Sequence, residues 1–174
     1  GVGYLGSIHA QIYTRLSDVT LVGVNDLDSD VGKRVAVDCE CEFYSNVDQL
    51  ADSVDAVSVV VPTSCHREVS LPFLSKGIPV LLEKPVAHTL DDARLIVNEA
   101  EQSGAILQIG HLERFNAGVV RLHEELDRPR FIEVHRLSEF VERATDVDVV
   151  TDLMIHDIED QKSTRLNSSH SEIS

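Results

Sequence analysis

Residues 1–6 read Gly-Val-Gly-Tyr-Leu-Gly, and this stretch decides the fold that we expect of the whole chain. In a Gly-x-Gly-x-x-Gly turn the first glycine makes the turn from strand to helix, and the second lets the backbone approach a pyrophosphate. The third glycine, Gly6 here, lets helix and strand pack closely. The turn predicts an α/β fold, a doubly wound parallel sheet that binds a dinucleotide at a helix N-terminus.

The glycine turn functions only after a buried strand. Because no residue precedes Gly1, we expect the chain to lack the first and central strand of its sheet. A helix is expected directly after the turn, over residues 7–16, followed by a buried β-branched strand over residues 19–24.

Asp26 lies at the tip of that second strand, about twenty residues beyond the glycine turn. A carboxylate at this place accepts hydrogen bonds from the adenosine ribose hydroxyls and repels a 2′-phosphate. The expected cofactor is therefore NAD, with NADP disfavoured. The alternative interpretation is that Asp26 and Asp28 are ordinary loop acids at the start of the next helix.

Strand and helix patterns alternate along the rest of the chain. Continuous apolar strands separated by helices are typical of a parallel sheet covered on both faces. The strand near residue 134 alternates more, which indicates a second domain with its boundary near residue 115. The expected helices cover residues 30–38, 47–51, 66–76, 89–103 and 117–126, and the strands 56–61, 80–82, 106–109 and 131–137.

We therefore divide the chain into three parts. Residues 1–115 are expected to form an NAD-binding Rossmann domain and residues 116–160 the start of a substrate-binding α/β domain. Residues 161–174 have no apolar periodicity, and residues 162–170 match the translation of a sequencing adapter. We expect this tail to be non-native, and we exclude it from the fold.

Composition limits the classes of partner. Asp and Glu number 30 against 15 Lys and Arg, and the formal charge of -15 disfavours nucleic acid and anionic membranes. No apolar stretch has the length of a membrane span, and a cytoplasmic location is expected. Cys39, Cys41 and Cys65 are odd in number and lack a second Cys-x-Cys pair, which predicts reduced thiols and no metal site.

Five short motifs follow one another along the chain. They are the glycine turn with His9, Pro62-Thr63 with His66, Glu83-Lys84-Pro85, Gly110-His111 with residues 113–116, and residues 152–157. In this order and spacing the motifs resemble the Gfo/Idh/MocA oxidoreductases, and the resemblance covers residues 1 to about 159. Within the family, the motifs are most similar to those of nucleotide-sugar 3-dehydrogenases acting on UDP-N-acetylglucosamine or its uronate. One departure is Ala117, where a proline is common.

The resemblance implies a Rossmann half followed by a substrate half that carries an open antiparallel sheet. It also implies an enzyme that transfers a hydride between nicotinamide and a sugar or nucleotide-sugar carbon, and a homo-oligomer. The residues expected to bind the cofactor are Gly1, Gly3, Tyr4, Leu5, Gly6, Asp26, Pro62, Thr63, His66, Glu83, Lys84, Arg114 and Asn116.

Residue chemistry points to three catalytic side chains. Lys84 follows a parallel strand, at the edge where ligands of open α/β sheets bind, and its ammonium can stabilise a developing alkoxide. We expect Glu83 to orient Lys84, and a cis bond before Pro85, frequent in the family, would aim the lysine. His156 lies four residues after Asp152, so on a helix a base and a carboxylate share one face. No third metal ligand is grouped with them.

Alternatives to this function remain open at the level of sequence. An inositol or aldose dehydrogenase, or a reductase of imines or biliverdin-like pigments, would share the family's motifs. A non-catalytic NAD-binding regulator would keep the glycines and Asp26, but it would not need Lys84 and His156 together.

Because it lacks the first strand, the chain as written is not expected to fold into an active enzyme. A strand of about five residues buries three or four apolar side chains, worth on the order of 5 to 12 kcal/mol. That rivals the total stability of a domain, about 5 to 15 kcal/mol. Thermal unfolding of residues 1–174 with and without NAD tests this expectation. A cooperative transition that NAD shifts upward would contradict it.

Overall fold

The computed structural model describes residues 1–125, and the predicted strand over residues 131–137 and the tail lie outside this part. The chain divides into two compact units, Gly1–Gly110 and His111–Ser174. Each unit is described by itself.

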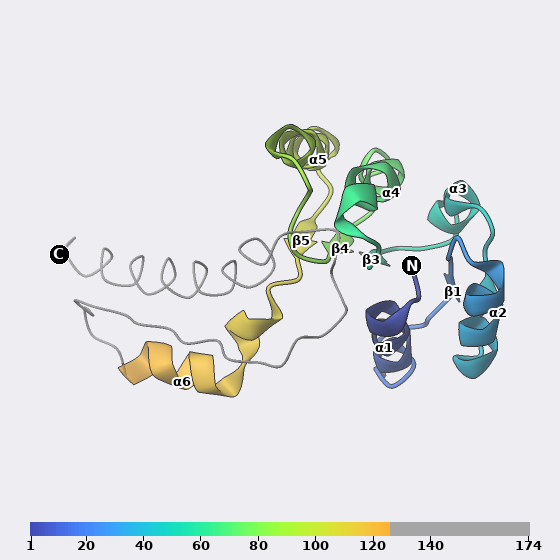
Figure 1. Ribbon diagram of the computed structural model, residues 1–174, viewed down its shortest axis with the longest axis horizontal. Coiled ribbons are helices and arrows are strands. Elements are labelled where there is room, and N and C mark those ends of the chain that lie inside the picture. Colours follow the sequence, from blue (N-terminus) through green and yellow to red (C-terminus); the bar gives the residue numbers. More distant parts are fainter. Residues whose placement is uncertain (126–174) are drawn as a thin grey trace. The chain divides into compact units, whose positions relative to one another are not determined.

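Helices and strands alternate through the first unit, as the sequence predicts (Figure 1). The helices are α1 (Tyr4–Tyr13), α2 (Ser29–Asp38), α3 (Val47–Ala51), α4 (His66–Leu74) and α5 (Leu90–Ser103), with a 3-10 turn η1 (Thr63–Cys65). The strands are β1 (Gly23–Val24), β2 (Glu42–Phe43), β3 (Val57–Val59), β4 (Val80–Leu82) and β5 (Leu107–Ile109). The second unit contributes η2 (Leu112–Phe115) and α6 (Ala117–Glu125) to the described residues.

The strands form two parallel sheets, ordered β1-β2 and β3-β4-β5. Parallel strands joined through helices confirm the predicted α/β class. β2 was not predicted, because a two-residue strand containing Glu42 has no apolar run to reveal it. The strand expected over residues 19–24 is paired only at Gly23 and Val24, because β2 is equally short.

The two sheets do not pair with each other, and a cavity of about 280 Å³ is lined by residues of both. In the usual strand order of this fold, the strand that enters the glycine turn lies between the second strand and the fourth. β1 and β3 hold those two places in the chain order. Val24 and Val59 line the cavity together with Gly1 and Ala10.

Each sheet has its own apolar core. The larger core is centred on Phe73, Leu74, Leu82 and Ile96, each no more than 1% exposed, and joins β3 and β4 to α4 and α5. The smaller core packs α1 and α2 against β1. Its buried members are Val2, Ala10, Val24, Val35, Ala36 and Cys39. Two separate cores follow from the two separate sheets, because each sheet buries its own apolar side chains.

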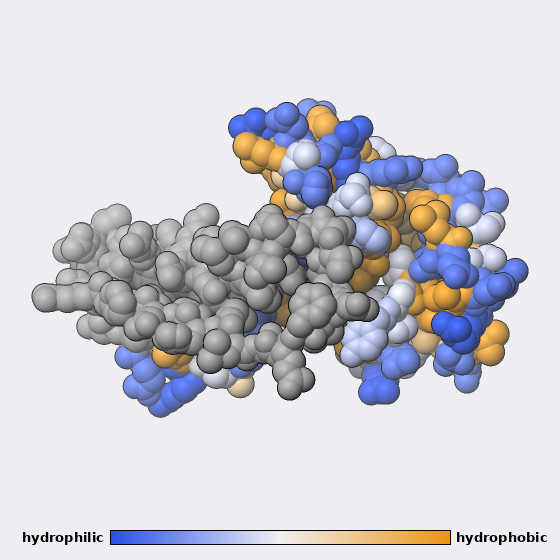
Figure 2. Space-filling model, in the orientation of Figure 1, coloured by the Kyte–Doolittle hydropathy of each residue, from blue (hydrophilic) through white to orange (hydrophobic). Residues whose placement is uncertain are grey.

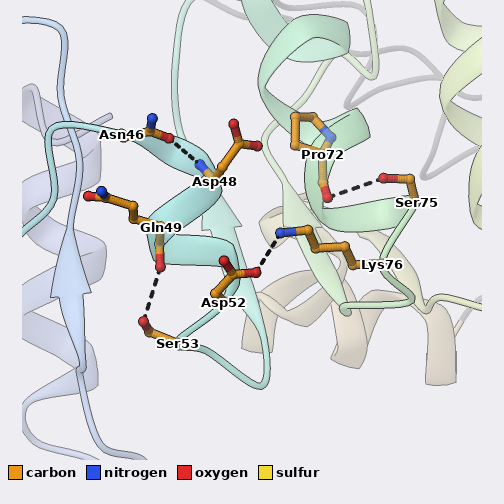
Figure 3. Close-up of polar contacts among 8 residues, drawn as sticks. All are labelled: Asn46, Asp48, Gln49, Asp52, Ser53, Pro72, Ser75 and Lys76. Carbon is orange, nitrogen blue, oxygen red and sulfur yellow. Dashed lines mark hydrogen bonds and ion pairs between the residues drawn. The ribbon is translucent and has the colours of Figure 1, made fainter.

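Side-chain caps fix the starts of α2, α3 and α5. The Asn46 side chain accepts from the Asp48 N–H at 2.7 Å, and the Lys76 ammonium lies 2.7 Å from Asp52, which ties α3 to the end of α4 (Figure 3). Thr89 accepts from the Asp92 N–H at 3.1 Å, which caps the first turn of α5. Hydrogen bonds from Arg67 and Thr89 hold the pKa of Asp92 below its usual value.

On the face seen in Figure 2, the described residues show groups of apolar side chains between polar ones. Leu27 is fully exposed and Val37 is 77% exposed. Scattered apolar residues are ordinary on a protein surface and mark no site by themselves. Within residues 1–125, no helix has the length and apolarity needed to cross a membrane.

Candidate functional site

The glycine turn opens α1 and leaves space in front of that helix. A Cβ at Gly1 would lie 2.5 Å from the Val60 carbonyl oxygen, and one at Gly6 would collide with the Gly1 carbonyl. A Cβ at Gly3, in contrast, would meet nothing within 4 Å. Packing within the protein therefore requires glycine at positions 1 and 6, whereas at position 3 the open space accommodates a ligand.

The N-terminus of α1 suits an anion. Gly3 is the N-cap and supplies no side-chain hydrogen bond, and the first turn contains no acidic residue. Tyr4 is 78% exposed and Leu5 is 39% exposed, so the first turn is open to solvent. Backbone N–H groups at such a helix start bind phosphate oxygens. The turn thus fits the pyrophosphate of a dinucleotide.

Asp26 lies just beyond β1 and is held against the glycine turn. Its Oδ2 accepts from the Val2 N–H at 2.7 Å, and its Oδ1 accepts from the Asp28 N–H at 2.9 Å. Each carboxylate oxygen has a second lone pair, which suits a ribose hydroxyl. Burial lowers the pKa of the Gly1 amino group, and the charge of Asp26 partly opposes that shift.

The carboxyl ends of β3 and β4 lead into the other predicted residues. Pro62 and the buried Thr63 begin η1 after β3. Half-buried Lys84 follows β4, and the expected cis bond is present between Lys84 and Pro85. Neighbouring parallel strands end at the same edge of a sheet, so these residues share one edge.

His66, the first residue of α4, is only 1% exposed. Its Nδ1 lies 2.9 Å from the Pro85 carbonyl oxygen and its Nε2 lies 3.1 Å from the Val61 carbonyl oxygen. Both ring nitrogens therefore face main-chain acceptors. One acceptor lies in the segment after β3 and the other in the segment after β4. These contacts join His66 to the segments that follow β3 and β4, and a direct contact with the cofactor stays a prediction.

Glu83 points into the protein, where it meets His9 and Gly110, two motif residues to which the sequence analysis assigned no function. Its Oε1 lies 3.4 Å from the Nε2 of His9, whose Nδ1 lies 2.9 Å from the Ser58 hydroxyl. A Cβ at Gly110 would lie 2.8 Å from the same Oε1. The helical spacing of Gly6, His9, Ala10 and Tyr13 was the available signal, because it places His9 on the inner face of α1.

The remaining predicted residues belong to the second unit or lie outside the described part. Arg114 lies in η2, and Asn116 follows it, with its amide donating to Glu113 at 3.1 Å and its oxygen accepting from the Gly118 N–H at 2.9 Å. Asp152 and His156 lie beyond residue 125. The roles predicted for these four residues stay predictions.

Cys39, Cys41 and Cys65 are free thiols. Burial raises the pKa of Cys39, with a smaller contribution from Asp38, and burial also raises the pKa of Cys41. Such thiols are poor nucleophiles. Within residues 1–125, no three His, Cys, Asp or Glu side chains are grouped to hold a metal.

A family model described as an oxidoreductase family with an NAD-binding Rossmann fold matches residues 1–111. The chain belongs to the Gfo/Idh/MocA oxidoreductase family. This confirms the resemblance of the motifs, the Rossmann fold and NAD as the cofactor of the family's binding domain.

Among curated members of the Gfo/Idh/MocA family, the UDP-N-acetylglucosamine 3-dehydrogenase of Acidithiobacillus ferrooxidans is 38% identical over 160 residues, which are 91% of this chain and 50% of that protein. Inositol 2-dehydrogenase 1 of Saccharopolyspora erythraea is 32% identical over 133 residues, 73% of this chain and 40% of that protein. The chain thus spans half or less of the length of these relatives.

Solved structures show the same similarity. A structure of the A. ferrooxidans enzyme superposes with a TM-score of 0.84 at 37% identity, covering 91% of this chain and 52% of that one. The myo-inositol dehydrogenase of Lactobacillus casei, in complex with NAD(H) and myo-inositol, gives a TM-score of 0.78 at 25% identity, covering 94% and 52%.

The glycine turn supplies a prediction that separates cofactor binding from folding. We define the embedded chain as a chimera of the A. ferrooxidans enzyme. In it, the residues of this chain that align with that enzyme replace the enzyme's own corresponding region. In the embedded chain, Gly3→Ala should weaken NAD binding by about tenfold or more, which is about 1.4 kcal/mol, with little change in melting temperature. Gly6→Ala should lower the melting temperature, because its Cβ meets backbone. Calorimetric titration and thermal unfolding measure both. Equal effects of the two variants on folding would contradict this assignment.

Proposed function

We propose that this chain is the NAD-binding and lysine-bearing part of a dehydrogenase that oxidises a secondary hydroxyl of a nucleotide sugar. The single observation behind the proposal is Lys84 at the carboxyl end of β4, in the same compact unit as the glycine turn and Asp26. A cofactor site and a polar side chain at the carboxyl edge of one parallel sheet are what hydride transfer to a bound alcohol requires.

When bound, NAD supplies the hydride acceptor. Lys84 would donate a hydrogen bond to the reacting oxygen and stabilise the negative charge that develops there. His156 would accept the hydroxyl proton, and Asp152 would orient its ring. In the adenosine diphosphate part of NAD, the glycine turn would hold the pyrophosphate through its N–H donors. Asp26 would hold the ribose hydroxyls through its carboxylate.

A nucleotide sugar is the substrate class best supported. The relative named for UDP-N-acetylglucosamine is 38% identical to this chain, against 32% for the inositol dehydrogenase. A free polyol such as inositol is the second candidate, because an inositol dehydrogenase of Shouchella clausii matches the same 91% of the chain at 30% identity. The cytoplasmic location and the homo-oligomer stay predictions.

The position of Asp26 predicts cofactor preference. In the embedded chain, NAD should bind more tightly than NADP, and Asp26→Asn should narrow the difference, because a 2′-phosphate would face a carboxylate at a cost of several kcal/mol. Asp28→Asn is the matched control, since it removes one charge nearby and keeps an N-cap oxygen for α2. Titration of the embedded chain and of each variant with NAD and with NADP measures the difference in affinity. Equal affinities before mutation would exclude this role for Asp26.

The catalytic assignment predicts that Lys84→Ala and His156→Ala each lower turnover of the embedded chain about 10² to 10⁴-fold, far more than they weaken NAD binding. Both groups act mainly in the transition state. Turnover is measured as NADH formation with UDP-N-acetylglucosamine and, separately, with myo-inositol. Near-normal turnover with both residues replaced would reject the mechanism. Faster turnover of myo-inositol than of UDP-N-acetylglucosamine would show that the substrate is a free polyol and not a nucleotide sugar.

A further inference from the structure

Two histidines hold the residues on either side of Lys84. His66 from α4 contacts the carbonyl of Pro85, the residue after the lysine. His9 from α1 contacts the carboxylate of Glu83, the residue before it. The turn that carries Lys84 is thus fixed from two helices, and the contact with His9 has no role in the function proposed above.

The surroundings of Glu83 show why it needs a partner. The residue is 7% exposed, and its Oε1 accepts no hydrogen bond from the residues that the structure describes. Its Oε2 accepts from the Lys84 N–H at 3.3 Å. A buried carboxylate is costly unless a donor or a positive charge compensates it. At 3.4 Å from Oε1, the Nε2 of His9 is an ion-pair contact available to that oxygen.

The geometry on the other side of the ring keeps His9 in this orientation. The Nδ1 of His9 lies 2.9 Å from the Ser58 hydroxyl on β3, and the His9 side chain is only 11% exposed. Gly110, at the end of β5, leaves the space that the Glu83 carboxylate occupies. One contact chain therefore connects α1, β3 and β4, and α1 is the helix that begins at the glycine turn.

We propose that His9 is a positioning residue for Lys84. The Nε2 of His9 contacts the Glu83 carboxylate at 3.4 Å, and this electrostatic contact fixes the main chain of the Glu83-Lys84 turn relative to the glycine turn. The proposal rests on the proposed function for its catalytic consequence, but the contact itself is independent of any activity. A lysine displaced from its working position loses up to about 10²-fold in rate.

Two amide variants separate the two contacts of the ring. In the embedded chain, His9→Gln places an N–H donor near the position of Nε2, toward Glu83, whereas His9→Asn places one near Nδ1, toward Ser58. We expect Gln to retain turnover within about threefold and Asn to lose tenfold or more, up to about 10²-fold, with the loss in kcat and not in the KM for NAD. His88→Asn, the same exchange at an exposed histidine, is the matched control and should leave turnover nearly unchanged.

A spectroscopic readout keeps the test independent of catalysis. The side-chain carboxyl carbon of Glu83, observed by NMR with labelled glutamate, should shift in His9→Asn and stay near its original position in His9→Gln. If turnover is absent before mutation while the carboxyl shift follows this pattern, the proposed function fails and the contact stands. Equal shifts in the Gln and Asn variants would overturn the positioning role.

If the variants fail to fold, a measurement on the unmutated embedded chain still tests the proposal. Long-range nitrogen–proton NMR of the His9 ring should find a proton on Nε2, because only a protonated nitrogen donates to a carboxylate. A ring protonated on Nδ1 alone would overturn the proposal without any mutation.

Discussion

The parallel pairing of β3 with β4 determines which segments meet at the carboxyl edge of the sheet. Val57 pairs with Val80 and Val59 with Leu82, so the two strands end at the same level. The segments that leave them, Pro62-Thr63 and Glu83-Lys84, are therefore neighbours at one edge of the sheet. A register shift of one residue would exchange the faces of every β4 side chain, and Leu82 would leave the core.

Buried polar groups reinforce this edge. His66 connects the Val61 and Pro85 carbonyls, and His9 lies between Ser58 and Glu83. Polar networks of this kind are stabilising only when each member has a partner, and they then restrict the backbone to one arrangement. A catalytic lysine benefits from such restriction, since its rate contribution depends on position.

The glycine turn and the lysine turn are thus connected by contacts and not only by the sheet. The inner face of α1 carries His9 and the first turn of the same helix offers its N–H groups to an anion. Membership of the Gfo/Idh/MocA family gives this arrangement its chemical meaning, since the matched region is an NAD-binding domain.

The sequence by itself determined the parallel α/β class, most helix and strand positions, and the family. These follow from local patterns: glycine spacing, apolar runs and short motifs act over a few residues. Only the tertiary structure decided the pairing of β2, whose two residues carry no apolar run, and the limits of β1. It also decided that Glu83 faces His9 and that His66 spans two carbonyls. Those contacts join residues 74 and 19 positions apart, and which distant polar groups meet depends on how the helices pack on the sheet.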